Sequence, residues 1–384
     1  MYDFEKPNYK ENNIINLMSS ISNNFGKKHK YNELKALDSR ELSKYDNIVL
    51  IVIDGLGYNY LKTQKDSFLY KHLKTKLSTT FLAATTCANT AFQVGYPPQQ
   101  HGLTGWTMYL KETKSIVKIL PFTNYDNDEQ VSENNLIIDN ILEIESYHKD
   151  FKSDCYTIIE KEKSKRKFIN YVASNTKIIP TETDIHVLPE LKDLINQKSK
   201  NRRYIHAYLD EFDSIQHISG VGTPKTNLFF ETIDNQIREL SKNIKNTKTK
   251  LIITSDHGMI DYDKDSQIFI ENIVGLEECL SIPITGEPRV RNCYVKPNKV
   301  DKFLKIVKNK LSKYCWCIKG EDIINDNFYG LGTPNPKLFD RVGDYILIMR
   351  DNYVLFDSTS NIQKATHGAF NEDERFVPLV TLDL

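Results

Sequence analysis

Ile48-Val-Leu-Ile-Val-Ile53, followed at once by Asp54-Gly-Leu-Gly57, is the stretch that decides the fold. Its continuous apolar, largely β-branched run predicts a strand buried on both faces, as in a parallel sheet covered by helices. Tyr204-Ile-His-Ala-Tyr-Leu209 and Leu251-Ile-Ile253 have the same character, and both lead into acidic residues. The sequence therefore predicts an α/β fold whose mostly parallel sheet is sandwiched by helices.

The segments outside these strands divide the chain. Residues 1–45 are rich in Asn, Lys and Ser, with one helix expected around Asn12 to Ser22, and we interpret them as a surface extension. Residues 46–384 are expected to form one domain, because α/β domains with insertions reach this length. Residues of about 107–200 and 261–336 are strongly charged and mixed in pattern, so we expect cap-like insertions there.

Composition narrows the class of protein. Apolar residues make up 40% of the 384 residues and charged residues 27%, which is ordinary for a soluble globular protein. Lys plus Arg and Asp plus Glu both total 51, so no net charge favours duplex nucleic acid or a membrane as partner. The polar N-terminus and the lack of a long apolar run predict a cytoplasmic protein. The six cysteines form no paired C-x-x-C motifs and are expected to be reduced.

Acidic and imidazole side chains follow the predicted strands. Ligand sites in open α/β sheets lie outside the carboxyl ends of the strands, so these side chains are expected to converge. Carboxylates and imidazoles suit zinc or manganese. The sequence therefore predicts two divalent metal ions, for which the candidate ligands are Asp54, Asp213, His217, Asp256, His257 and His367.

A threonine hydroxyl is the candidate nucleophile. Phe81-Leu-Ala-Ala-Thr85-Thr86 leads into a predicted helix that runs toward Val94. A hydroxyl at a helix N-terminus meets the positive end of the helix dipole, and coordination to a metal lowers its pKa further. We favour Thr85, with Thr86 as the alternative.

Six motifs follow one another in an order that identifies a family. They are Ile53-Asp-Gly-Leu-Gly57, Phe81 to Thr86, Gly95-Tyr-Pro-Pro-Gln-Gln-His-Gly-Leu-Thr-Gly105, Glu211-Phe-Asp-Ser-Ile-Gln-His217, Thr254-Ser-Asp-His-Gly-Met259 and Thr366-His-Gly368. From Asn47 to the C-terminus, the sequence resembles the type I phosphodiesterase and nucleotide pyrophosphatase branch of the alkaline phosphatase superfamily. The resemblance implies an alkaline-phosphatase-like catalytic domain over residues 46–384.

The resemblance also implies roles for individual residues. One metal ion, normally zinc, would be held by Asp54, Thr85, Asp256 and His257, and the other by Asp213, His217 and His367. Spacing from Phe81 to Gly95 places the nucleophile at Thr85, although Leu82, Ala83 and Ala84 replace the family's usual Pro and Ser or Thr. Asn89 is implied as a substrate-binding residue, although its offset of three residues from the nucleophile fits Thr86 alone.

The expected reaction is hydrolysis of a small phosphodiester or pyrophosphate, nucleotides included, through a phosphothreonine intermediate. Phe81 to Leu110 contains no Arg or Lys for a dianionic monoester, but it contains several aromatic residues that suit a diester. Arg289, Arg291 and Arg341 could reach an anionic substrate, but we favour the interpretation that each forms a surface salt bridge. The alternatives are a phosphomonoesterase of the same superfamily and a catalytically silent binding protein that retains the fold. A sulfatase is disfavoured because Cys87-Ala-Asn-Thr-Ala91 lacks the Pro and Arg of the sulfatase motif.

Overall fold

A computed structural model describes residues 4–131, 138–142, 146–245, 247–357 and 362–384. The larger half of the molecule is built on a seven-stranded sheet of order β2-β18-β9-β1-β8-β6-β7. Neighbouring strands from β9 to β7 are parallel, whereas β18 is antiparallel to both β9 and β2. The predicted mostly parallel sheet is confirmed. Its strands are β1 (Asn47–Ile53), β2 (Leu73–Ser78), β6 (Asp154–Glu160), β7 (Lys177–Thr181), β8 (Arg203–Leu209), β9 (Thr249–Thr254) and β18 (Phe376–Asp383).

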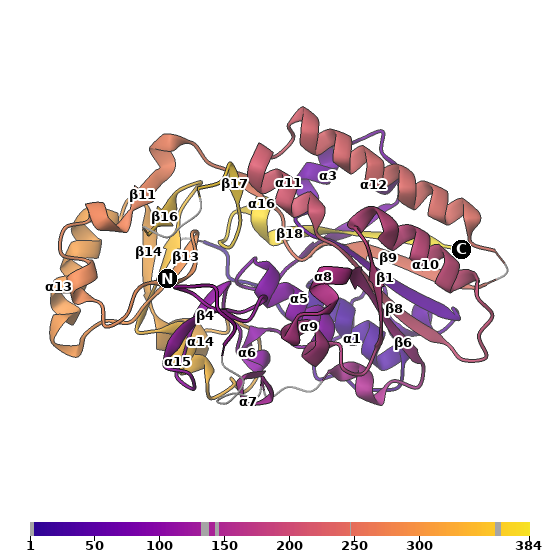
Figure 1. Ribbon diagram of the computed structural model, residues 1–384, viewed down its shortest axis with the longest axis horizontal. Helices are drawn as coiled ribbons and strands as arrows, with labels where there is room; N and C mark the ends of the chain where they lie inside the picture. Colours follow the sequence, from indigo (N-terminus) through magenta and orange to yellow (C-terminus); the bar gives the residue numbers. More distant parts are fainter. Residues whose placement is uncertain (1–3, 132–137, 143–145, 246, 358–361) are drawn as a thin grey trace.

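The packing of strand β1 on both of its faces explains why its sequence is continuously apolar. Ile48, Leu50 and Val52 pack into one hydrophobic cluster, and the alternate residues Val49, Ile51 and Ile53 pack into another. Helices cover both faces of the sheet (Figure 1). One face carries α1 (Ile14–Asn24), α5 (Thr85–Val94) and α9 (Lys167–Val172), and the other carries α3 (Tyr58–Thr63), α10 (Val187–Asn196) and α12 (Pro224–Asn243).

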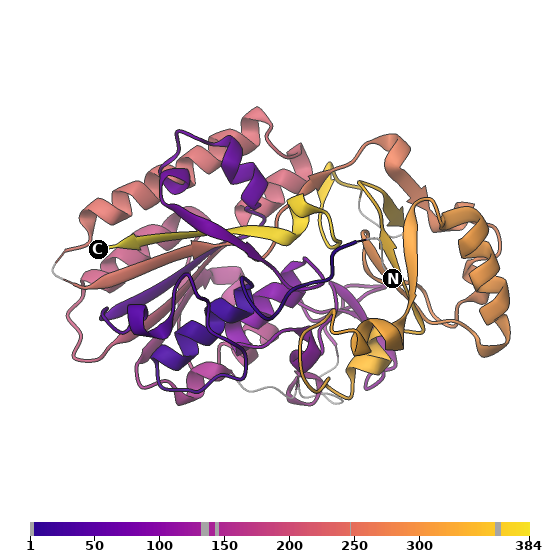
Figure 2. The same cartoon turned by 180° about the vertical axis from the view of Figure 1, so that it is seen from behind.

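A second sheet forms the smaller half of the molecule, on the left in Figure 1 and on the right in Figure 2. Its seven strands have the order β14-β15-β13-β12-β3-β4-β5, and all their pairings are antiparallel. Helix α13 (Val300–Ile306) lies beside this sheet. The strands are β3 (Thr107–Leu110), β4 (Ser115–Lys118), β5 (Thr123–Asn124), β12 (Thr285–Glu287), β13 (Val290–Cys293), β14 (Cys315–Lys319) and β15 (Tyr345–Met349).

Short elements complete the chain. The helices are α2 (Ser39–Leu42), α4 (Phe68–Lys71), α6 (Pro98–His101), α7 (Asp139–Leu142), α8 (Lys161–Ser164), α11 (Glu211–Ser219), α14 (Gly320–Asn325), α15 (Leu338–Val342) and α16 (Glu372–Arg375), and the strands are β10 (Ile260–Asp261), β11 (Gln267–Phe269), β16 (Val354–Phe356) and β17 (Ala365–Thr366). None of the described helices is long and apolar enough to cross a membrane. All six cysteines are free thiols.

The predicted limits of the two insertions need correction. Only the start of the 107–200 segment joins the second sheet, because β6, β7 and α10 belong to the main fold. The predicted end of the second insertion, at residue 336, is too early, because β15 extends the second sheet to Met349. The first error has a physical cause: β6 is only half buried over its first residues, so its sequence mixes polar and apolar residues.

The N-terminal residues are not a surface extension, and that interpretation was wrong. The expected helix forms as α1, but its residues Ile14 to Ser22 are all buried. Asn13 and Asn16 form a capping box at its start, so these polar residues serve the helix end rather than the solvent. The hydroxyl of Tyr9, also buried, donates to the carbonyl of Phe328 and accepts a hydrogen bond from the amide of Phe81.

Candidate metal centre and active site

Side chains from the ends of three central strands meet at one edge of the main sheet. Asp54 follows β1, and Asp256 and His257 follow β9. Helix α11, which follows β8, carries Asp213 and His217 one turn apart. His367 comes directly after β17, and Thr85 is the first residue of α5. The structure therefore brings all seven predicted metal-site residues to this edge.

One group consists of Asp54, Asp256 and His257, whose candidate ligand atoms all lie within 4.8 Å of one another. His257 Nε2 is 3.3 Å from Asp54 Oδ1 and 3.6 Å from Asp256 Oδ2. Thr85 Oγ1 lies 3.0 Å from the same His257 nitrogen. Two carboxylates, an imidazole and a hydroxyl thus share one small space, and these are the residues that the family resemblance implies for one metal ion.

A second group consists of Asp213, His257 and His367, again with ligand atoms within 4.8 Å. The ring of His367 stacks on that of His257 with centroids 3.7 Å apart. His217 Nε2 is 3.3 Å from Asp213 Oδ2, and its ring centroid is 5.3 Å from that of His367. His257 therefore lies between the two groups. The assignment of particular ligands to particular ions stays a prediction.

The three imidazoles are oriented by the backbone. Nδ1 of His217, His257 and His367 lies 2.8 to 3.0 Å from the carbonyl oxygens of Ala365, Gly258 and Ala83 respectively. A carbonyl only accepts, so each Nδ1 carries the hydrogen. Nε2 is then the nitrogen with a lone pair, the arrangement seen for histidine ligands of metals.

Three carboxylates of the site are buried without enough positive charge or hydrogen-bond donors around them. Asp54 Oδ1, Asp213 Oδ1 and Asp256 Oδ2 are buried and have no hydrogen-bond partner among the described residues. Burial raises the pKa of Asp54 well above its usual value, and the neighbouring Asp256 and Asp213 add to this. Burial also raises the pKa of Asp213. A divalent cation reverses this penalty by supplying the missing positive charge, so the donor set fits metal ions.

Neighbouring groups hold the carboxylates in place. The buried hydroxyl of Tyr208 donates to Asp54 Oδ2. Asp256 Oδ1 accepts hydrogen bonds from the backbone amides of Gly55 at 3.3 Å and His257 at 3.0 Å. These bonds leave the opposite carboxylate oxygens directed at the site, which is how outer partners orient metal ligands.

Gly258 explains why a glycine follows Asp256-His257. A Cβ atom at this position would lie 1.9 Å from the carbonyl oxygen of Asp373 and 2.8 Å from Cα of Gly57. The loop after β9 therefore touches both the loop after β1 and helix α16. Only the absence of a side chain allows this approach.

A cavity of about 400 Å³ opens next to these residues, between the two sheets. The main-sheet half contributes Thr85, Thr86, Asp213, His217, Thr366 and His367 to its wall. Thr86 is buried, and it is the hydroxyl of Thr85 that lies 3.0 Å from His257 Nε2. Asn89 is buried on α5 and does not line this cavity, so its substrate-binding role stays a prediction.

The opposite wall comes from the smaller half, and the sequence alone does not identify the full set of residues that form it. It includes Trp106, Lys118, Tyr125, Glu287 and Arg291. Burial raises the pKa of Glu287 to about 7. The charged pattern of these segments indicates an insertion, but the sequence does not indicate which of the many charged side chains face the cavity.

The interpretation of three arginines as surface residues was wrong. Arg289, Arg291 and Arg341 are all buried, and only Arg291 lines the cavity. Arg289 is paired with Glu374, with a shortest distance of 2.7 Å. Arg341 donates to the carbonyls of Gly102 and Ile141. Arg289 and Arg341 therefore hold loops in place, whereas Arg291 lines the cavity.

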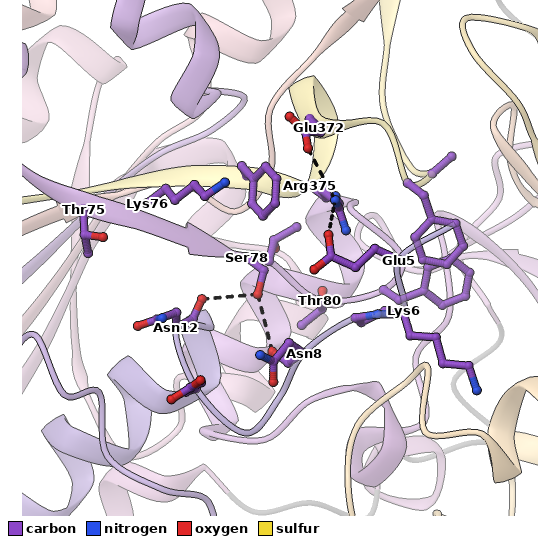
Figure 3. A pocket seen from close by; sticks show the side chains of 17 residues that line it. Glu5, Lys6, Asn8, Asn12, Thr75, Lys76, Ser78, Thr80, Glu372 and Arg375 are labelled. Carbon is purple, nitrogen blue, oxygen red and sulfur yellow. Dashed lines mark hydrogen bonds and ion pairs between the residues drawn. The ribbon is translucent and has the colours of Figure 1, made fainter. Parts of the chain in front are cut away.

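Another cavity, of about 310 Å³, lies between the N-terminal segment, β2 and α16 (Figure 3). None of the seven predicted metal-site residues lines it. Its charges neutralise one another: Arg375 lies 2.6 Å from Glu5 and 3.7 Å from Glu372, and Lys6 pairs with Asp326. This cavity therefore lacks the chemistry found at the sheet edge.

Comparisons with known proteins agree with the fold. Murine ectonucleotide pyrophosphatase/phosphodiesterase 5 is similar in structure, with a TM-score of 0.65 and 15% identity over 86% of this chain and 87% of that chain. Phosphonoacetate hydrolase from Sinorhizobium meliloti 1021 has a TM-score of 0.64 and 16% identity over 87% of this chain and 89% of that chain. At these identities the likeness establishes the fold alone. No curated protein matches the chain.

The sequence profile that describes type I phosphodiesterases and nucleotide pyrophosphatases matches residues 48–370. This range includes all seven converging residues and both walls of the cavity. The chain therefore belongs to the type I phosphodiesterase / nucleotide pyrophosphatase family, a family of phosphoric ester hydrolases.

Proposed function

We propose that the protein hydrolyses phosphodiester or pyrophosphate bonds of small molecules with the help of two divalent metal ions, Thr85 being the nucleophile. The observation that carries the proposal is the position of Thr85 Oγ1, 3.0 Å from His257 Nε2 and in the wall of the cavity. Asp54, Asp256 and His257 would hold one ion. Asp213 and His367 would hold the other, together with His217, which lies beside both. When bound, such ions neutralise charge on the attacking and leaving oxygens.

The chain itself supplies the remaining parts of the reaction. Helix α5 begins at Thr85, and its N-cap Ala84 offers no capping side chain, so the amides of Thr85 and Thr86 can face a phosphoryl group, whereas the Cys87 amide donates to the Ala84 carbonyl. The helix dipole favours the deprotonated Thr85 hydroxyl. Attack by Thr85 on phosphorus releases the leaving alcohol or phosphate and forms a phosphothreonine. Water then cleaves that ester and regenerates Thr85.

Two relatives guide the choice of substrate. A threonine-to-alanine variant of the murine relative, described as inactive, forms a complex with AMP. The Sinorhizobium enzyme forms complexes with phosphonoformate and phosphonoacetate. A nucleotide or another small phosphorus anion is therefore proposed as the ligand of this cavity, whose volume lies within the usual range for small-molecule sites.

The test compares three aryl substrates under one zinc or manganese condition: a phosphodiester, a nucleoside-monophosphate aryl ester and a phosphomonoester. We expect the two diesters to have the larger kcat/KM. We also expect Thr85→Ala to lose several orders of magnitude in turnover while it still binds metal, and Thr86→Ala to be mild. Faster monoester turnover would reject the diesterase assignment, and the reverse order of the two variants would move the nucleophile to Thr86.

A further inference from the structure

Two cationic side chains face the same cavity as the nucleophile. Lys118, the last residue of β4, and Arg291, on β13, line the cavity together with Thr85. Both belong to the smaller sheet, so neither position is required by the metal centre on the main sheet. A buried arginine beside a site is costly unless anionic groups compensate for it.

The two cations are fixed from behind by protein groups. Lys118 Nζ lies 2.6 Å from Asp128 Oδ1, and the Asp128 side chain is 72% exposed. Arg291 Nε donates to the carbonyl of Leu355 at 2.8 Å, and Nη1 is 3.7 Å from Asp357 Oδ2. Neither Asp128 nor Asp357 lines the cavity. The two acids therefore hold the cations at the wall from outside the lining of the cavity.

The aromatic neighbour of this pair supports the same orientation. Tyr125 also lines the cavity, and its ring centroid is 5.8 Å from Lys118 Nζ. Its hydroxyl donates to the carboxylate of Asp357, the acid that lies behind Arg291. Tyr125 thus links the two cations into one feature of the wall, which we call the cationic wall (Lys118, Tyr125 and Arg291).

We infer that the cationic wall binds a second anionic group of the substrate, a phosphate or a carboxylate, joined by a short linker to the phosphorus that Thr85 attacks. The inference rests on the proposed function and narrows its substrate class. A pyrophosphate meets this description, whereas a diester with two neutral arms does not. The small cavity, of about 400 Å³, keeps the two anionic groups close together.

Besides the proposed metal ligand Asp213, one acid lines the cavity on the side of the cationic wall. Glu287 lines the wall, but its Oε1 accepts a hydrogen bond from the backbone amide of Trp106 at 2.7 Å. That bond directs one oxygen of Glu287 at the chain rather than at a ligand. The competing interpretation is that Lys118 only forms the ion pair with Asp128. An exposed ion pair of this kind contributes little to the stability of the fold.

The experiment measures binding rather than turnover, so that its failure is distinct from failure of the hydrolase proposal. Isothermal titration calorimetry on the zinc-loaded protein compares ethylphosphonate, which has one anionic group, with 2-carboxyethylphosphonate and ethane-1,2-diphosphonate, which have two. The variant is Lys118→Gln, and the control is Lys114→Gln, an exposed lysine in the turn between β3 and β4. The two bifunctional probes distinguish a carboxylate from a phosphate as the second group.

We expect at least one bifunctional probe to bind about tenfold more tightly than ethylphosphonate, as one charge-assisted contact warrants. This ratio should fall toward one in Lys118→Gln and in Arg291→Lys, and it should persist in Lys114→Gln. Equal affinity of all three probes for the wild type would overturn the inference. An undiminished ratio in Lys118→Gln would overturn it as well, even if the enzyme hydrolyses diesters.

Discussion

The hydroxyl of Tyr208 donates a hydrogen bond to Oδ2 of Asp54, while Oδ1 of the same carboxylate has no hydrogen-bond partner among the described residues. Tyr208 precedes the end of β8 by one residue, so the strand next to β1 orients a side chain at the end of β1. The bond fixes which oxygen of Asp54 faces the proposed metal. This relationship gives the first prediction.

Tyr208→Phe should lower the affinity of the proposed metal site that contains Asp54 by about 10- to 100-fold, because Asp54 loses the partner that orients it. Competition with a chromogenic zinc chelator measures this. Tyr204→Phe is the matched control: Tyr204 is a buried tyrosine on the same strand, and its hydroxyl lies 3.3 Å from that of Tyr147. Equal affinities of the two variants would show that the Tyr208 bond has no part in metal binding.

Removing two proposed ligands should remove metal. Wild-type protein reconstituted with zinc is expected to hold nearly two ions per chain by elemental analysis, and the Asp256→Ala/His257→Ala double variant far fewer, because two donors of one group are lost. The control is the double variant Asp193→Ala/His186→Ala, which removes one acidic and one imidazole side chain at two exposed positions. Full metal content in the first double variant would contradict the assigned site.

Glu287 gives a pH-dependent prediction for the metal-free protein. Burial raises its pKa from 4.5 to about 7, so folding favours the protonated carboxyl. A raised pKa means that the stability contributed by protonation is present below about 4.5 and lost as the pH rises through 7. Glu287→Gln keeps an acceptor for the Trp106 amide but cannot ionise.

Thermal unfolding in EDTA across pH 4 to 8 checks this expectation. The difference in Tm between Glu287→Gln and wild type should grow in favour of the variant from about pH 4.5 to 7 and then level off. Using the difference cancels the titration of the other groups. A difference that is constant with pH would show that Glu287 titrates normally.

Gly258→Ala should destabilise the fold by about 3 kcal/mol, because the added methyl group would lie 1.9 Å from the Asp373 carbonyl oxygen. Urea unfolding measures the loss. Gly222→Ala is the control: its added methyl meets no atom within 4 Å, although its φ of +69° still costs about 1 kcal/mol. Equal losses in the two variants would argue against the close contact at Gly258.

The sequence predicts the centre of the molecule well because its signals there are local. The apolar run of β1 reflects burial on both faces. Asp54 follows β1 and Asp256 follows β9, and these two strands pair directly with one another. Strand β8 pairs with the other side of β1. Convergence of their side chains follows from that register alone. For the same reason the main sheet and the meeting of Asp54 with Asp256 and His257 are predictable without coordinates, whereas Thr85 and His367 come from α5 and from the residue after β17.

The rest depends on contacts between distant segments. Lys118 and Arg291 reach one cavity only because β3 pairs with β12 across more than a hundred residues of sequence. Helix α1 looked peripheral because Asn and Ser fill its sequence, yet Ser19 and Asn16 bond to backbone carbonyls of Tyr31 and Asn32 and are buried with it. A buried segment whose polar side chains are hydrogen-bonded to the backbone can therefore have the same amino-acid composition as a surface segment.

The cavity has two walls with separate structural origins. The proposed nucleophile and ligands depend on the parallel sheet, whereas Lys118 sits at the end of a hairpin, β3 to β4, that belongs to the other sheet. In the described sheets, neither strand of that hairpin pairs with β1, β8 or β9. Over evolutionary time such a scaffold can acquire new ligands by exchanging a short peptide, and a chimera that transplants the hairpin is the corresponding route in protein engineering.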